Sequence, residues 1–366
     1  MKVESLSRLR DVLPGVPLVE SPLFYGLIDE LDLDPTERQT ALDLHERGYA
    51  VIDFPDPLLN QRAERIKSDL EMHFGAHIAD PNSGKSAGQR VQDAWIHNED
   101  VRAIAANRVV LALLAKLYGR KAFPFQTLNF PVGTQQPLHS DSIHFSAIPE
   151  RFMCGVWLAL EDVGLDAGPL TYLPGSHKWP ILQNVMIGRK GSGSSRENAQ
   201  APFQSAWDAL RAQSETKPET FVAKKGQALI WAANLLHGGS PQRNSTLTRW
   251  SQVTHYYFED CIYYTPAYSD EALGKLDLRV VVDAETEELK PNLYFGKTLV
   301  GREPSPRAPS WISRIRRQFR SWPDLPQDFD SDAYYRLNPD VAVARLDPVE
   351  HYLAHGRREG RRYRYR

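Results

Sequence analysis

Two histidines and an aspartate lie within six positions of the chain, in the stretch QPLHSDSIHF at residues 136–145. Residues i and i+2 of an extended strand project to the same side, so His139 and Asp141 are expected to converge. A second imidazole from a distant strand would complete a set of two histidines and one carboxylate. That set suits iron(II) and leaves coordination positions open for other ligands. We expect His144 to be structural or substrate-bonding rather than a ligand.

A later stretch supplies the missing imidazole and a cation. His237 ends the apolar run ALIWAANLLH, and the glycines that follow allow close approach of backbone and ligand. Arg249 opens the next β-rich run, where its guanidinium could clamp a carboxylate with two parallel hydrogen bonds. A metal triad with a fixed arginine is what a 2-oxo acid with a distal carboxylate needs.

The elements that must position these residues change in type along the chain. Residues 1–120 read as helical with one short strand at 49–55, and the expected helices cover residues 34–48, 56–75 and 98–119. From residue 121 to 265, short β-rich runs alternate with glycine and proline turns. This spacing predicts an antiparallel sandwich or jelly roll rather than alternating β-α units. Residues 181–220 read as an insertion with one short helix, either a lid or a surface loop.

The C-terminal region is different in composition. Residues 301–328 read as a linker followed by a basic amphipathic helix, with Trp311, Ile315, Phe319 and Trp322 on one face. Such a helix packs on its own protein or lies weakly on a membrane surface. Residues 329–366 look like a small helical module whose arginine-rich end is either solvated or docked to a polyanion.

The composition is that of a globular protein, with 42% hydrophobic and 25% charged residues in a chain of 366. The net charge of −2 gives no electrostatic reason to expect nucleic-acid binding. Cys154 and Cys261 are too few for a disulfide framework. We find neither a signal peptide nor a transmembrane segment in the sequence, and we expect a reducing, cytoplasmic setting.

Several motifs then occur in order: H-x-D at 139–141, GVWLALEDVGLDAGPLTYLPGSHK at 155–178, KKGQALIWAANLLHGGS at 224–240 and NSTLTR at 244–249. Over about residues 45–265 the chain resembles the phytanoyl-CoA dioxygenase family of iron(II)/2-oxoglutarate oxygenases. The resemblance implies a mainly β fold with flanking helices, built on a double-stranded β-helix (jelly roll). It implies an oxygenase domain at 1–300, with helices at 1–120 and the jelly-roll core at 121–300.

The resemblance also assigns roles to residues. His139, Asp141 and His237 match the iron ligands, and Arg249 matches the arginine that binds the distal carboxylate of 2-oxoglutarate. Trp157 matches an aromatic residue beside the co-substrate or substrate. Family members often carry a serine two residues after the distal histidine; Gly239 stands there in this chain, so we assign that role to Ser240.

Two amides precede the H-x-D motif on the run FPFQTLNF. Gln126 and Asn129 could bind 2-oxoglutarate or substrate, or they could be ordinary strand groups paired locally.

An intact Asp141 implies hydroxylation, because halogenating relatives replace that carboxylate with a small residue. Fe(II), 2-oxoglutarate and O2 are then the expected cofactors, and the products are succinate, CO2 and a hydroxylated substrate. Desaturation and ring closure use the same ligands and stay open.

The substrate class is expected to be a small or carrier-linked metabolite. About residues 329–362 resemble a module attached to bacterial glycosyltransferases, which hints at a saccharide or glycan and at a bacterial source. An acyl-CoA or fatty-acyl hydroxylase is the first alternative, and a jelly-roll binding protein that has lost turnover is the second.

Overall fold

The computed structural model describes residues 9–74, 90–194, 199–294, 296–299, 325–326, 328–343 and 346–364. The predicted basic amphipathic helix, with Trp311, Ile315, Phe319 and Trp322, lies outside these residues.

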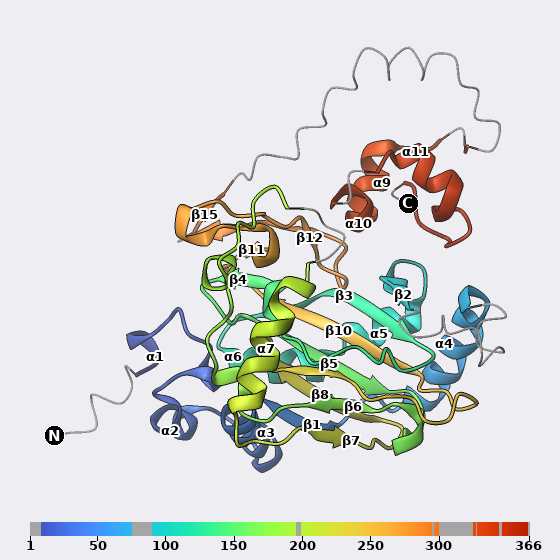
Figure 1. The fold of residues 1–366 in the computed structure, drawn as a ribbon. Coiled ribbons are helices and arrows are strands. Elements are labelled where there is room, and N and C mark those ends of the chain that lie inside the picture. Colours follow the sequence, from blue (N-terminus) through green and yellow to red (C-terminus); the bar gives the residue numbers. More distant parts are fainter. Residues whose placement is uncertain are drawn as a thin grey trace.

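Two antiparallel sheets form the centre of the fold (Figure 1). The large sheet has the order β1-β8-β5-β10-β3-β2, and the small sheet has the order β7-β6-β9. The large sheet consists of β1 Tyr49–Asp53, β8 Gln227–Ala232, β5 Met153–Ala159, β10 Ser251–Phe258, β3 Ala122–Phe130 and β2 Val91–Gln92. The small sheet consists of β7 Glu219–Phe221, β6 Leu170–Tyr172 and β9 His237–Gly239. The remaining strands form two-stranded pairs: β4 Ser146–Ile148 with β11 Ile262–Tyr264, β12 Val281–Val282 with β13 Leu289–Lys290, and β14 Leu293–Tyr294 with β15 Lys297–Thr298.

Each strand of the large sheet divides its side chains between two cores, as the period of two requires. On β8, Ala228 and Ile230 join the core shared with the helices, whereas Leu229 and Trp231 join the core that faces the small sheet. The mainly β fold with flanking helices and a jelly-roll core is therefore confirmed.

Helices cover the outer face of the large sheet. The helices of the N-terminal region, including those on this face, are α1 Leu9–Val12, α2 Phe24–Leu27, α3 Pro35–Arg47, α4 Leu59–Phe74, α5 Glu99–Ala105 and α6 Arg108–Tyr118. Helix α3 begins at a capping box between Asp34 and Glu37 and ends at Gly48, whose φ of 83° suits glycine. The single helix expected over 98–119 is two helices. Asn107 interrupts it, because its side chain accepts hydrogen bonds from Val109 and Val110 and starts a new helix.

The insertion contains helix α7, Ala201–Gln213, which stands in front of the sheets in Figure 1. Its Phe203 and Trp207 are buried in one cluster with Leu173 and Leu236, which flank the small sheet. The helix is therefore packed against the fold.

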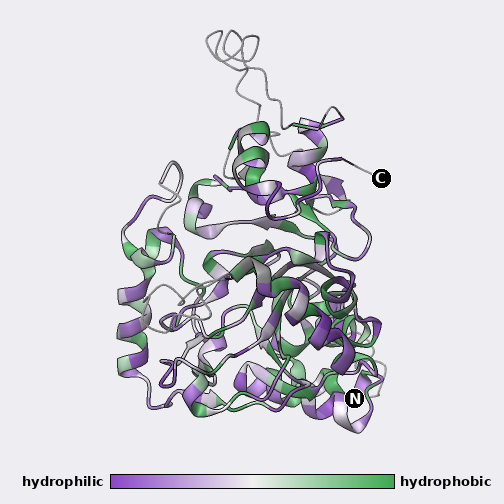
Figure 2. Ribbon diagram, turned by 90° about the vertical axis from the view of Figure 1, so that its right-hand side faces the viewer, coloured by the Kyte–Doolittle hydropathy of each residue, from purple (hydrophilic) through white to green (hydrophobic). Residues whose placement is uncertain are grey.

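The C-terminal helices have a small core of their own, built from Tyr334, Val341 and Tyr352. They are α9 Ser331–Leu337, α10 Pro339–Val343 and α11 Pro348–His351, and the last continues as a π-helical stretch at Tyr352–Gly356. Figure 2 shows them grouped above the sheets, with both hydrophobic and hydrophilic segments. No helix among the described residues is long and apolar enough to cross a membrane.

The arginines near the C-terminus have partners inside the chain. Both oxygens of Asp340 lie 2.7 Å from Arg361, and Arg364 lies 2.5 Å from Asp328. Arg362 pairs with Glu287, which follows β12. The Arg362–Glu287 pair ties the C-terminal helices to the segment between β12 and β13, and all three pairs use charges that a polyanion would need.

Candidate active site

The residues of the H-x-D motif and the distant histidine come together. One ligand atom from each of His139, Asp141 and His237 lies within 4.8 Å of the others. The Nε2 atoms of His139 and His237 lie 3.8 and 3.5 Å from the Asp141 carboxylate oxygens. The backbones of the two histidines form an antiparallel bridge, with both N–H···O distances at 2.9 Å. A single ion could therefore contact all three side chains.

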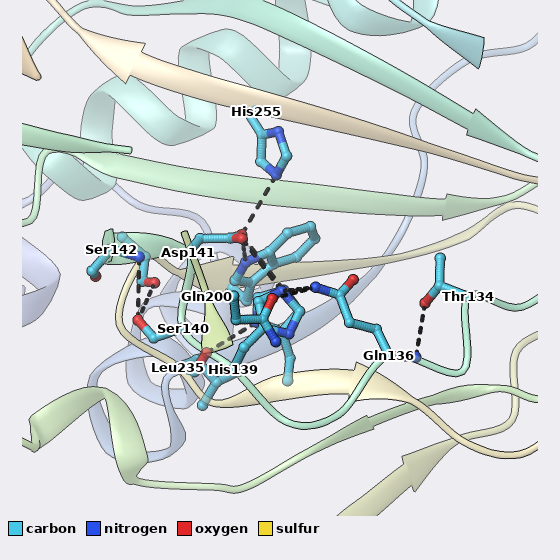
Figure 3. A network of polar contacts seen from close by, with 12 residues as sticks. Thr134, Gln136, His139, Ser140, Asp141, Ser142, Gln200, Leu235 and His255 are labelled. Carbon is cyan, nitrogen blue, oxygen red and sulfur yellow. Dashed lines mark hydrogen bonds and ion pairs between the residues drawn. The ribbon is translucent and has the colours of Figure 1, made fainter. Parts of the chain in front are cut away.

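Hydrogen bonds fix which nitrogen each imidazole presents. The Nδ1 of His139 lies 3.0 Å from the Pro137 carbonyl, and the Nδ1 of His237 lies 3.0 Å from the Leu235 carbonyl. A carbonyl can only accept, so each Nδ1 carries the proton and each Nε2 keeps its lone pair. The amide of Gln136 donates to His139 Nε2 at 3.2 Å, which agrees with this tautomer (Figure 3). Metal-binding histidines are oriented in this way.

The carboxylate of Asp141 is held from behind by two aromatic side chains. Trp231 Nε1 donates to its Oδ2 at 3.0 Å. His255 Nε2 lies 3.5 Å from the same oxygen (Figure 3). The other nitrogen of His255 lies 3.0 Å from Gln126 Oε1. Burial alone would raise the pKa of Asp141, but His237, His255 and His139 outweigh it and keep the pKa below its usual range. The carboxylate is therefore ionised and oriented.

The two imidazoles need to be neutral to bind a metal. Burial, followed by the neighbouring His237, lowers the pKa of His139 to about 3. The ring is thus unprotonated throughout the neutral range.

The triad lies on the wall of a cavity of about 620 Å³, and Arg249 and Trp157 lie on the same wall. Arg249 is 1% exposed, and its NH1 donates to the Gly168 carbonyl at 2.9 Å. Its Nε and the Nε1 of Trp157 have no hydrogen-bond partner among the described residues. The guanidinium carbon lies 5.7 Å from the centre of the Trp157 ring.

Burial lowers the pKa of Arg249 to about 10, so the group is still a cation at neutral pH. No carboxylate of the described chain pairs with it. A buried cation without a counter-charge is costly unless a ligand supplies one. The donor set beside it suits iron, and the arginine suits the distal carboxylate of 2-oxoglutarate. The residues therefore fit both cofactors.

A comparison with protein-family models matches residues 39–249 to the phytanoyl-CoA dioxygenase (PhyH) family, which is more than half of the chain. The chain belongs to the phytanoyl-CoA dioxygenase family. The predictions of a non-haem iron, 2-oxoglutarate-dependent dioxygenase, and of iron, 2-oxoglutarate and O2 as its cofactors, are confirmed by this match. A search of curated proteins found no match.

Several solved structures are similar to this chain. The carbocyclase SnoK from nogalamycin biosynthesis, a non-haem α-ketoglutarate-dependent enzyme, is 16% identical with a TM-score of 0.50, covering 74% of this chain and 95% of its own. The epimerase SnoN in complex with Fe3+, α-ketoglutarate and nogalamycin RO is 19% identical (TM-score 0.48; 73% and 97% covered). EctD from S. alaskensis with 2-oxoglutarate and 5-hydroxyectoine is 16% identical (TM-score 0.46; 66% and 86% covered).

The three other candidate binding residues, Gln126, Asn129 and Ser240, lie in different places. Gln126 lines the cavity, but Asn129 lies on the opposite face of β3, where its amide donates to Gln252 at 3.3 Å. Positions 126 and 129 are three apart, and a strand directs them to opposite sides. Ser240 is not among the residues that line the cavity. A Cβ at Gly239 would meet Thr134 Oγ1 at 3.0 Å, and Thr134 does line the cavity.

Other cavity residues are not assigned by the sequence patterns. His255 stands in the β-rich run TRWSQVTHYYF, and nothing in that run signals its contact with Asp141. Trp231 stands in an apolar strand, and the one signal for its role is that a buried indole N–H needs a partner. Arg279, which precedes β12, and Asp340 of α10 also line the cavity, and both lie beyond the matched family region.

Proposed function

We propose that the protein hydroxylates a C–H bond of a small metabolite, with one iron held by His139, Asp141 and His237. The observation that carries the proposal is the triad and the unpaired, buried Arg249 on the wall of one cavity. When bound, iron and 2-oxoglutarate supply the oxidising power. The balanced reaction converts 2-oxoglutarate, O2 and R–H into succinate, CO2 and R–OH.

The chain's own residues position the co-substrate and the metal-binding carboxylate. Arg249 orients 2-oxoglutarate through its distal carboxylate, and Trp157 walls that part of the cavity. We propose Thr134 rather than Ser240 as the hydroxyl donor to the co-substrate. Trp231 and His255 hold the Asp141 carboxylate in one orientation. Asp141 itself favours hydroxylation over halogenation, because the carboxylate occupies the position that a halide would need.

The substrate is proposed to be related to saccharides or glycans, whether free or carrier-linked. Support comes from the resemblance of the C-terminal helices to a module of bacterial glycosyltransferases. Pro339 and Asp340 of those helices also line the cavity. An acyl-CoA or fatty-acyl substrate is the competing prediction. A cytoplasmic location stays a prediction; Cys154 and Cys261 are free and buried, which agrees with it.

The test is a screen of saccharides, acyl-CoA thioesters and small acids, scored by succinate formed from 2-oxoglutarate in air. Under argon, Fe(II) and 2-oxoglutarate should first give the weak visible charge-transfer band expected of the family. Asp141→Ala, which removes a ligand, is the control and should give neither signal. If the wild-type protein gives neither the band nor succinate, the interpretation that remains is a jelly-roll binding protein without turnover.

A further inference from the structure

A second arginine of the cavity wall has no opposite charge. Arg279 lines the same cavity as the triad, and no carboxylate among the described residues forms an ion pair with it. Its NH1 makes only long hydrogen bonds, at 3.4 Å to the His144 carbonyl and 3.3 Å to Thr265 Oγ1. Its Nε is buried and has no partner within the described part of the chain. The edge of the guanidinium that binds carboxylates side-on is therefore free.

The surroundings of Arg279 fix its position without neutralising it. The guanidinium carbon lies 4.8 Å from the centre of the Phe145 ring and 6.0 Å from that of Phe125. Aromatic faces attract a cation and exclude water, but they carry no net charge. The charge therefore stays uncompensated at the wall of the cavity.

Arg279 lies close to the metal ligands and away from Arg249. The His144 carbonyl accepts from Arg279, and the His144 N–H donates to the carbonyl of Asp141 at 2.9 Å. Phe125 of β3 lies opposite the second half of β10, where the pairing shifts between His255 and Tyr256, whereas Arg249 precedes β10. The two arginines therefore serve different parts of one cavity.

The charges of the loaded centre do not compensate Arg279. Iron(II) and Arg249 bring three positive charges, and Asp141 and 2-oxoglutarate bring three negative charges. Elsewhere on the wall, Asp340 is held at both oxygens by Arg361, and Asp93 opposes the charge of Arg90. Among the described residues Arg279 is left as a cation without a counter-charge, which a substrate would supply.

We infer that Arg279 binds a carboxylate group of the substrate, so that the substrate is a small carboxylic acid, such as an acidic sugar or an amino-acid derivative. The inference rests on the proposed function and narrows its substrate class. The carboxylate accepts two parallel hydrogen bonds from the free edge of the guanidinium. Since Arg279 contacts the backbone of His144, three residues after Asp141, the carbon that is oxidised is expected to lie near the carboxylate.

The experiment compares matched pairs of probes: small carboxylic acids, including uronic acids and acylated amino acids, and their primary amides. Phosphate monoesters of similar size form a third arm. The readout is the rise in succinate release from the Fe(II)/2-oxoglutarate enzyme. We expect acids to stimulate release and amides not to. In Arg279→Gln, the KM for a stimulating acid should rise roughly 10- to 100-fold, with the KM for 2-oxoglutarate unchanged.

Arg279→Lys should recover part of the preference for acids, which a merely structural role would not predict. The control is Arg211→Gln, an exposed arginine of α7, which should behave as the wild type. If Arg279→Gln does not fold, the lysine variant and the acid–amide comparison in the wild type still test the inference.

Amides or phosphate monoesters that equal the acids, or no stimulation by any acid, would overturn the inference. If the anaerobic charge-transfer band still forms in that case, the proposed function stands. If the band is missing as well, both fail.

Discussion

Trp231 and Asp141 are 90 positions apart in the sequence, yet the indole N–H of one donates to the carboxylate of the other at 3.0 Å. Trp231 lies on β8 of the large sheet. The cavity lies where the large sheet meets the small sheet, which carries His237. The room for its indole comes from Gly155 on the neighbouring strand β5, where a Cβ would meet the ring at 2.1 Å. The sheet therefore orients a metal ligand without contacting the metal.

Trp231→Phe should weaken Fe(II) binding by about 10-fold, because it keeps the ring but removes the donor that fixes Asp141. Metal affinity can be measured anaerobically by titration. Trp250→Phe is the matched control, since Trp250 packs against Phe74 of α4 on the helical side. Equal losses of affinity in both variants would contradict a role for the indole N–H.

His255→Asn should lower turnover by about 10- to 100-fold, because an asparagine cannot bridge Gln126 and Asp141 as the imidazole does. The same loss is expected in Gln126→Leu, which removes the side chain that contacts the other nitrogen of His255. The two effects should not add in the double variant, since both residues act through one carboxylate. Additive losses would show that they act separately.

Arg249→Gln should raise the KM for 2-oxoglutarate at least about 10-fold and should not lower the stability of the cofactor-free protein. Stability should not fall, because a buried, unpaired guanidinium costs free energy in the folded state. Arg151 gives the contrast: it pairs with buried Glu20 at 2.6 Å, so Arg151→Gln should cost about 3 kcal/mol of unfolding free energy without changing that KM. Urea unfolding and steady-state kinetics measure both effects.

The pH dependence of stability should include a contribution from His177. Its Nε2 donates to the His45 carbonyl at 3.1 Å, and its Nδ1 has no partner among the described residues. Burial lowers its pKa to about 4, against about 6.5 in an unfolded chain. Between these values the unfolded chain binds more protons, so stability falls by up to about 3 kcal/mol as pH drops from about 6.5 to about 4. In His177→Gln, urea unfolding should show a shallower loss; an unchanged slope would refute the assignment.

Much of this site is predictable because its chemistry is local. His139 and Asp141 flank one extended residue, Ser140, whose hydroxyl then accepts from the Ser142 N–H and starts a 3-10 helix at Asp141–Ile143. The i, i+2 argument needs only that single extended residue. The period of two along the run that forms β3 also separates Gln126 from Asn129, and this follows from their spacing alone.

The rest depends on contacts that no local pattern encodes. His255 faces the cavity with Val253, two positions earlier on β10, but its contact with Asp141 depends on how the fold brings β10 to the His139–Asp141 segment. Arg279 and Asp340 reach the cavity from segments beyond the matched family region, and their positions follow from packing. The division of the helix at Asn107 is readable as a cap, but the apolar periodicity on either side favours one continuous helix.

The central claim is that one ion is held by His139, Asp141 and His237 with 2-oxoglutarate anchored on Arg249. Anomalous diffraction from crystals grown with Mn(II) and 2-oxoglutarate tests it most directly. We predict a single anomalous peak in contact with both Nε2 atoms and the Asp141 carboxylate, and a co-substrate whose distal carboxylate contacts Arg249. A peak that lacks any of the three side chains, or a co-substrate bound away from Arg249, would contradict it.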